Sequence, residues 1–258
     1  GLFVGGAVPA LVFGVAFGNL LQGVPFELDG FMRSTYTGSC WGLLNPVGLL
    51  AGVVSLSMLV MHGALYLQLR TEGELNARAA KAARWFGALF MAAFALAGVW
   101  QAAGIEGFRI VAMPDPGGVV SPLSKTVEMV EGAWMQNYTT RPWTMSAPIV
   151  AFAGGLLALL FSAAKRSGLA FVCSGAAVAG VIMTAALAMF PFIMPSSTQP
   201  NVSLTAYDAV SSHLTLNLMF IAVVVFLPIV LLYTSWVYSV LRGKLSEDKI
   251  RKETHTAY

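Results

Sequence analysis

Six long apolar stretches constrain what this chain can fold into more than any other feature of its sequence. Each reaches about 20 residues or more, which is the length a helix needs to cross the hydrocarbon core of a bilayer. None of them contains Asp, Glu, Lys or Arg. They cover residues 1–24, 46–69, 85–104, 142–164, 168–190 and 214–241.

The overall composition supports a membrane protein. Hydrophobic residues make up 57% of the chain and charged residues only 10%, whereas a soluble domain has roughly 25% charged residues. An ordinary soluble domain is therefore excluded. The sequence predicts an all-α fold, a polytopic transmembrane helical bundle of six spanning helices that forms a single domain over residues 1–258.

Lysine and arginine are unevenly divided among the segments that connect the spans. Of the 15, eleven lie in residues 70–84, in the turn at 165–167 and in the tail 242–258, while the remaining segments hold only four. Because cytoplasmic loops carry the excess of basic residues, the tail 242–258 is predicted to be cytoplasmic and the loop 105–141 extracytoplasmic. The cations form no basic face, so membrane lipids rather than nucleic acid are the expected surroundings.

The loop 105–141 contains a helix-like pattern. Val127, Val130 and Trp134 follow one another at helical spacing, which predicts a short amphipathic helix over 124–137 with Ser124 as its N-cap. Such a helix could lie on the membrane surface or against a partner subunit. A solvated loop with one or two helical turns is the alternative.

A polar hinge at 189–217 separates the last two spans. Pro191 and Pro195 cannot continue a helix, so the fifth span should end near Phe190. Ser211 or Ser212 can cap the next helix by accepting hydrogen bonds from its free N–H groups. The segment is thus expected to be a well-capped turn outside the membrane.

The spans offer little chemistry, because an acid or base within the bilayer is the usual sign of a proton path or substrate site. Their polar residues are uncharged and are expected to form hydrogen bonds between helices. These residues are Asn19, Gln22, Ser55, Ser57, His62, Thr184 and Asn217. No P-loop, CxxC, GxSxG or HExxH motif is present in the sequence.

The histidines do not form a heme site on this topology. Two imidazoles that bind one heme must lie at a similar depth, but His62 falls in the inner half of the second span and His213 at the outer mouth of the sixth. His255 lies in the tail. A neutral His62 bonded to a neighbouring helix is expected, and no catalytic, cofactor-binding or metal-binding residue is assigned. Cys40 and Cys173 are expected near opposite membrane surfaces and unbridged.

Several strings, in order along the whole chain, resemble subunit II of the cytochrome bd quinol oxidases. They are VAFGNLLQGVPF (15–26), LLNPVGLLAGV (43–53), YLQLRTEGE (66–74), FALAGVW (94–100), AMFPFIMPSS (188–197) and LTLN (214–217).

The resemblance implies a bacterial cytoplasmic-membrane complex that oxidises quinol and reduces O2 to water. It also implies that subunit I is the partner and holds hemes b and d, while subunit II packs against it and in some members holds a quinone in a structural role. The family's subunit II begins with further helices that carry acidic residues of the proton route. The chain is therefore expected to be a fragment, with no proton-path residue at a numbered position.

Two other functions fit a chain of this kind without the resemblance: a secondary transporter or permease, and a membrane scaffold with no redox partner. A transporter should show broken helices and polar groups that converge at the midplane of the membrane. Here the polar residues are scattered. Heme absorbance in the co-purified complex would distinguish the oxidase from both.

Small residues four positions apart predict close helix contacts in the first two spans. Gly14, Gly18, Gly48 and Gly52 would let backbones approach, since lipid provides no hydrophobic drive for helices to associate. The partner of these faces could be other helices of this chain, further N-terminal helices or subunit I.

Overall fold

The computed structural model describes residues 1–113 and 121–240. The predicted cytoplasmic tail 242–258, with His255, lies outside these ranges. Within them, six helices are long and apolar enough to cross a membrane, and the prediction of six spans is confirmed. They are α1 (Leu2–Gln22), α2 (Pro46–Arg70), α3 (Gly73–Gly104), α5 (Ser146–Ala163, preceded by the 3-10 turn Pro142–Met145), α6 (Ser167–Met189) and α7 (His213–Val240).

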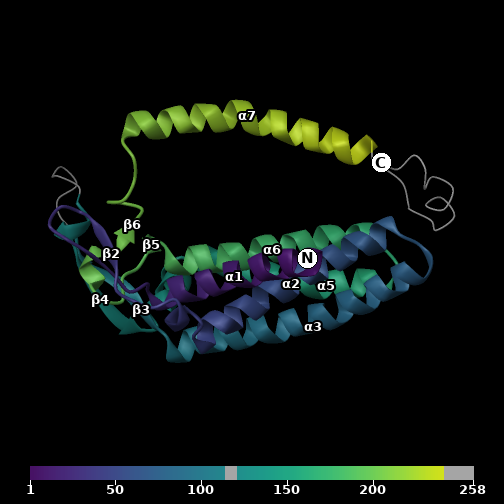
Figure 1. The fold of residues 1–258 in the computed structure, drawn as a ribbon, viewed down its shortest axis with the longest axis horizontal. Helices are drawn as coiled ribbons and strands as arrows, with labels where there is room; N and C mark the ends of the chain where they lie inside the picture. Colours follow the sequence, from purple (N-terminus) through teal and green to yellow (C-terminus); the bar gives the residue numbers. More distant parts are fainter. Residues whose placement is uncertain (114–120, 241–258) are drawn as a thin grey trace.

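Five of these helices form a bundle, and α7 lies apart from it (Figure 1). The turns α2–α3 and α5–α6 lie together at one end, here called the basic end. Three small antiparallel sheets lie at the other, here called the hairpin end. They pair β1 (Phe26–Leu28) with β2 (Ser34–Tyr36), β3 (Glu106–Ala112) with β4 (Thr126–Glu131), and β5 (Phe192–Met194) with β6 (Leu204–Thr205).

Close backbone contact joins α1 to α2, as the glycine spacing predicts. A Cβ added to Gly18 would lie 2.8 Å from the Cα of Gly48, and one added to Gly14 would meet the backbone of residues 51 and 52. Ser55 Oγ donates to the Ala10 carbonyl oxygen at 2.7 Å across the same contact. The partner of the glycine face is therefore another helix of this chain.

The centre of the bundle is a core shared by α2, α3, α5 and α6. Met61, Leu65 and Phe90 are fully buried there. Gly154 of α5 lies so close to α6 that an added Cβ would be 2.8 Å from the Ala177 nitrogen. Small residues thus let α5 and α6 pack backbone to backbone.

The basic loop expected at 70–84 is mostly helix, so that prediction is wrong. The stretch is rich in Ala and Arg, which are among the strongest helix formers, and α3 begins at Gly73. The link to α2 is only Thr71 and Glu72. Asn76 closes it by donating from Nδ2 to the carbonyl oxygens of Gln68 (2.7 Å) and Thr71 (2.9 Å).

The prediction of a helix over 124–137 is also wrong, because residues 126–131 form strand β4. Val127 pairs with Ile110 and Val130 with Gly107 of β3. The β-branched residues of this stretch suit a strand, and pairing with β3 satisfies the backbone hydrogen bonds that a helix would otherwise supply. Ser124 is no N-cap; its hydroxyl donates to the Ser121 carbonyl oxygen in a 3-10 turn, Pro122–Ser124. A short helix, α4 (Gln136–Thr140), follows the strand.

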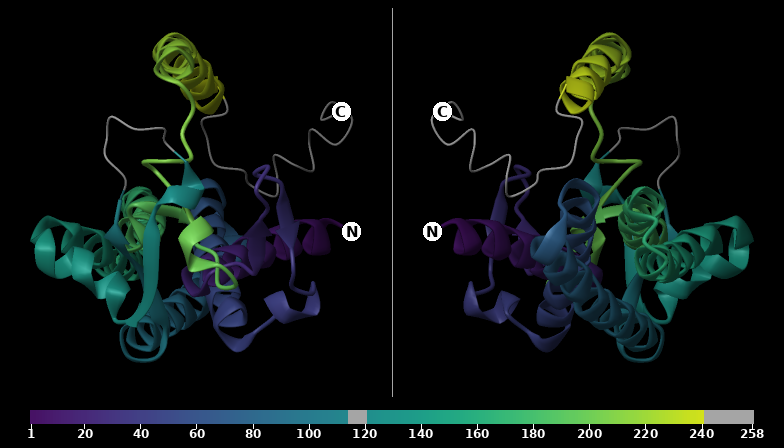
Figure 2. Two further views of the ribbon diagram at one scale, coloured as in Figure 1. Left: turned by 90° about the vertical axis from the view of Figure 1, so that its left-hand side faces the viewer. Right: turned by 90° about the vertical axis from the view of Figure 1, so that its right-hand side faces the viewer.

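The hinge begins and ends where the sequence predicts. Helix α6 ends at Met189, and Ser212 caps α7, since its Oγ accepts from the Thr215 N–H at 3.4 Å and its carbonyl oxygen from the Leu216 N–H. Between these points, Pro200–Val202 forms a 3-10 turn. Helix α7 then runs over 28 residues without a buried side chain, and both end-on views show it standing clear of the bundle (Figure 2).

Candidate functional site

Two asparagines join α1 and α2 at the hairpin end. Asn19 Nδ2 donates to the carbonyl oxygens of Val15 (2.8 Å) and Leu43 (2.7 Å), and its Oδ1 accepts from Asn45 Nδ2 at 2.8 Å. Asn45 Oδ1 in turn caps α2 by accepting from the Gly48 N–H. Asn19 thus bonds between elements, as predicted, and it fixes how the first connection enters α2.

Other polar span residues behave differently. Ser57 and Thr184 donate to carbonyl oxygens of their own helices, at Val53 and Gly180, so the prediction of bonds between helices is wrong for these two. Within a helix, Ser and Thr hydroxyls can donate to the carbonyl oxygen four residues earlier instead of to another helix. Asn217 is exposed on α7. The buried Gln22 Oε1 has no hydrogen-bond partner within residues 1–113 and 121–240.

His62 bonds to a neighbouring helix, as predicted. Its Nδ1 lies 2.7 Å from Ser174 Oγ of α6, and the Ser174 hydroxyl donates to the Phe171 carbonyl oxygen at 2.7 Å. A hydroxyl has one proton to give, so Ser174 accepts from His62 and the imidazole carries its proton on Nδ1. The Nε2 lone pair then remains available as an acceptor.

An aromatic ladder continues from His62 toward the basic end; it comprises His62, Tyr66, Arg70, Phe171 and Tyr238. The first three are spaced by four and share one face of α2. Phe171 stacks on His62 with ring centroids 4.5 Å apart, and the Arg70 guanidinium lies 5.6 Å from the Tyr66 ring centroid. Tyr238 of α7 approaches Tyr66 edge-on at 6.4 Å. The ladder therefore offers a stacking surface and hydrogen-bond donors on one side of the bundle.

The described histidines do not fit a bis-histidine heme. His62 follows Pro46 by 16 residues, so at 1.5 Å per residue it lies about 24 Å along α2 from the hairpin end. His213 begins α7 at that end. In the part of the chain that the structure describes, no group of three His, Cys, Asp or Glu residues could hold a metal ion. Cys40 and Cys173 are free cysteines.

The hairpin end holds a polar core that the sequence did not predict. Lys125 Nζ lies 2.6 Å from Asp208 Oδ2, and the two side chains are 0% and 4% exposed. Lys125 also donates to the Pro122 carbonyl oxygen at 2.9 Å, while Asp208 Oδ1 accepts from the N–H and hydroxyl of Thr205. A buried ion pair thus ties the loop 105–141 to the hinge. The one sequence signal was that Asp208 is the only charged residue of the hinge 189–217.

Side chains of the same layer cap two transmembrane helices. Trp134 Nε1 donates to the Leu21 carbonyl oxygen at the end of α1. Asn137 Nδ2 donates to the carbonyl oxygens of Leu187 (3.0 Å), Ala188 (3.1 Å) and Phe190 (2.6 Å) at the end of α6. Burial raises the pKa of the neighbouring Tyr138 above its usual value. The hinge is therefore an integral part of a packed layer rather than a turn alone.

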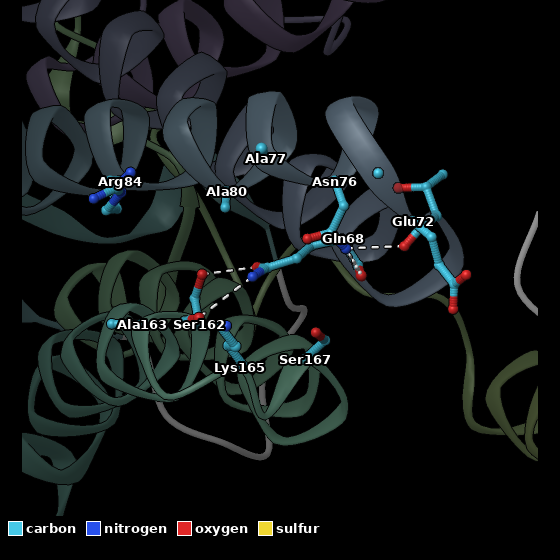
Figure 3. Close-up of a pocket in the computed structure, with 12 residues that line it drawn as sticks. Gln68, Glu72, Asn76, Ala77, Ala80, Arg84, Ser162, Ala163, Lys165 and Ser167 are labelled. Carbon is cyan, nitrogen blue, oxygen red and sulfur yellow. Dashed lines mark hydrogen bonds between the residues drawn. The ribbon is translucent and has the colours of Figure 1, made fainter. Parts of the chain in front are cut away.

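A pocket of about 580 Å³ opens at the basic end, between the α2–α3 and α5–α6 turns (Figure 3). Gln68 and Ser162 are buried at its floor, where Ser162 Oγ donates to Gln68 Oε1 at 2.7 Å. Its lining residues are Gln68, Thr71, Glu72, Gly73, Asn76, Ala77, Ala80, Arg84, Ser162, Ala163, Lys165 and Ser167.

The sequence is similar to known proteins along its entire length. A family model described as cytochrome bd terminal oxidase subunit II matches residues 1–241. The chain is 46% identical over 258 residues to "Cytochrome bd-I ubiquinol oxidase subunit 2" of Escherichia coli (strain K12) and 48% identical over 258 residues to "Probable cytochrome oxidase subunit 2" of Haemophilus influenzae. Each alignment covers 100% of this chain and 68% of the relative. "Cytochrome bd ubiquinol oxidase subunit 2" of Bacillus subtilis is 26% identical over 249 residues, which are 96% of this chain and 64% of that protein.

Proposed function

Because the chain belongs to the cytochrome bd terminal oxidase subunit II family, we propose that it serves its complex by packing against the heme-bearing subunit I and stabilising it. The family assignment confirms the resemblance seen in the sequence. The chain is a subunit of a terminal quinol oxidase complex, an oxidoreductase, and a multi-pass protein of the bacterial inner membrane. The assignment decides against the permease and the non-redox scaffold.

The proposed reaction of the complex is the oxidation of quinol, ubiquinol by the names of the relatives, coupled to reduction of O2. Two quinols give four electrons and four protons, which convert one O2 to two water molecules. In this proposal hemes b and d belong to subunit I and supply the electron transfer. This chain contributes no catalytic residue, and the depth mismatch of His62 and His213 supports that division.

The observation that carries the proposal is the surface of α7. All of its residues are partly or fully exposed over a length that crosses the bilayer, while the other helices bury their glycine faces against each other. In lipid, helices associate through van der Waals packing rather than through a hydrophobic drive. Helix α7, with the exposed side of α1 around Phe3 and Phe13, therefore provides the apolar area for contact with subunit I.

A structural quinone forms a further part of the proposal, and the aromatic ladder has the residues that would hold one. A planar ring can stack beside Phe171 and Tyr66, and the Tyr66 hydroxyl or the Arg70 guanidinium can donate to a ring carbonyl. Quinone extracted from the purified complex should fall when Tyr66 is replaced by Leu. Equal quinone content in the two complexes would rule the ladder out.

Affinity purification through a tag on this chain tests the main proposal. A subunit II should bring heme absorbance and quinol-dependent O2 uptake with it. A chain that elutes in homogeneous form from a heme-replete strain without either would refute the packing role.

A further inference from the structure

We propose that the pocket at the basic end binds a phosphate group, the head group of an anionic phospholipid or free phosphate. The site goes beyond the oxidase function, which needs no phosphate. It is a cavity of about 580 Å³ between four helix ends, and its residues come from both turns of the basic end (Figure 3).

Two cations line the pocket, and neither has a carboxylate partner among residues 1–113 and 121–240. Arg84 comes from α3 and Lys165 from the α5–α6 turn. The one acid in the lining is Glu72. It precedes Arg84 by 12 residues, a helical distance of about 18 Å, so it lies at the opposite end of the pocket from Arg84 in Figure 3.

The start of α6 adds donors to the same wall. Ser167 begins the helix and lines the pocket, and no side chain caps this N-terminus. The first N–H groups of a helix lack partners within the helix and favour an anion. Lys165 adopts a left-handed conformation (φ 58°) that turns the chain tightly into α6. The hydroxyl, the N–H groups and the two cations are the donors that bind phosphate oxygens.

The shape of the pocket depends on small side chains. Ala77 and Ala80 of α3 and Ala163 of α5 line it. Larger side chains at these positions would fill the space between the two turns. Next to Arg84, Trp85 is 70% exposed on the outer side of α3, a position typical of a ring at the membrane interface. Basic pockets of this kind between spanning helices bind lipid head groups.

The test measures phosphatidylglycerol binding to the purified, delipidated oxidase complex by native mass spectrometry. The pocket variant is Arg84→Gln with Lys165→Gln. The matched control is Arg78→Gln with Lys81→Gln, which removes two exposed charges from the same end of α3 but none from the pocket lining. Each cation of the pocket should contribute about fivefold. The pocket variant should therefore bind about twenty-five-fold more weakly, and the control should bind as wild type.

A second variant fills the cavity and keeps its charge. Ala80→Leu should weaken phosphatidylglycerol binding while heme absorbance shows that the complex assembles. Titration with inorganic phosphate distinguishes the two sources of the group. Loss of lipid binding alone identifies a head-group site, and loss of phosphate binding in the pocket variant identifies a free-phosphate site. If both ligands bind the pocket variants as tightly as they bind the control, the proposal is overturned.

Discussion

The buried pair Lys125–Asp208 should be the most sensitive point of the hairpin end. Replacing Lys125 with Met keeps a long apolar stem but removes the Nζ that lies 2.6 Å from Asp208 Oδ2. The carboxylate then stays buried with only the Thr205 N–H and hydroxyl as donors. Breaking a buried pair in this way costs about 3–5 kcal/mol, because an uncompensated charge remains.

The expected loss concerns the local opening of this layer, because both partners of the pair lie in the connections of the hairpin end and neither lies in a span. At about 1.4 kcal/mol per factor of ten, amide hydrogen exchange should accelerate by roughly two to three and a half orders of magnitude. Peptides that contain the N–H groups of Val127 and Thr205 report it, because these groups donate to side chains of the hinge, Asn201 Oδ1 and Asp208 Oδ1. Exchange followed by mass spectrometry on the assembled complex is the assay.

Two further variants test whether the unpaired buried charge causes the loss of protection. Lys125→Met combined with Asp208→Asn removes both charges and should recover most of the protection, as neutral replacements of buried pairs often do. Arg109→Met breaks the exposed pair with Glu128, whose N···O distance is 3.5 Å, and should change exchange by less than about fivefold. A double variant as unprotected as Lys125→Met, or a Lys125→Met no worse than Arg109→Met, would refute the argument.

The remaining predictions concern the spans. Gly18→Leu should lower the yield of assembled, heme-containing complex, since overpacking costs typically about 1–3 kcal/mol and the α2 backbone leaves no room for the side chain. Gly98→Leu on α3, where an added Cβ meets nothing within 4 Å, should leave the yield unchanged. A cysteine placed at Arg78 should react with membrane-impermeant reagents only after the cytoplasmic side is exposed, because the basic residues gather at that end. Labelling from outside would contradict the predicted topology. His62→Ala should leave the heme spectrum of the complex unaltered, and a spectrum that loses a heme band would show that His62 is an iron ligand.

The spans were predictable because the bilayer imposes a strict requirement of length and polarity. Pro46 starts α2 where the sequence suggests, and the prolines after Phe190 end α6. Even the glycine contact of α1 could be anticipated, since spacing by four marks one face of a helix. The partner of that face could not be deduced, because spacing carries no information about which helix lies opposite.

The hairpin end was much harder to predict because its structure depends on contacts between distant loops. Val127 and Trp134 are spaced as on a helix, yet the pairing of Val127 with Ile110 decides for a strand. The partnership of Lys125 with Asp208 joins residues from different loops. No local pattern encodes such a pair. The pocket around Lys165 likewise forms only when two turns meet at one end of the bundle.

The layer at the hairpin end combines residues that are synthesised at widely separated times. It combines Phe26, whose carbonyl oxygen accepts from Ser196 Oγ, with Lys125 and with Asp208. About 180 residues separate the first of these from the last, and at roughly 5–20 residues per second a ribosome needs on the order of 10–40 seconds to cover them. Until residue 208 has been made, the loops that hold Phe26 and Lys125 lack the partners that later bury them. The layer can therefore be completed only after α6 and the hinge that follows it have been made, which places its formation late in the folding of this chain.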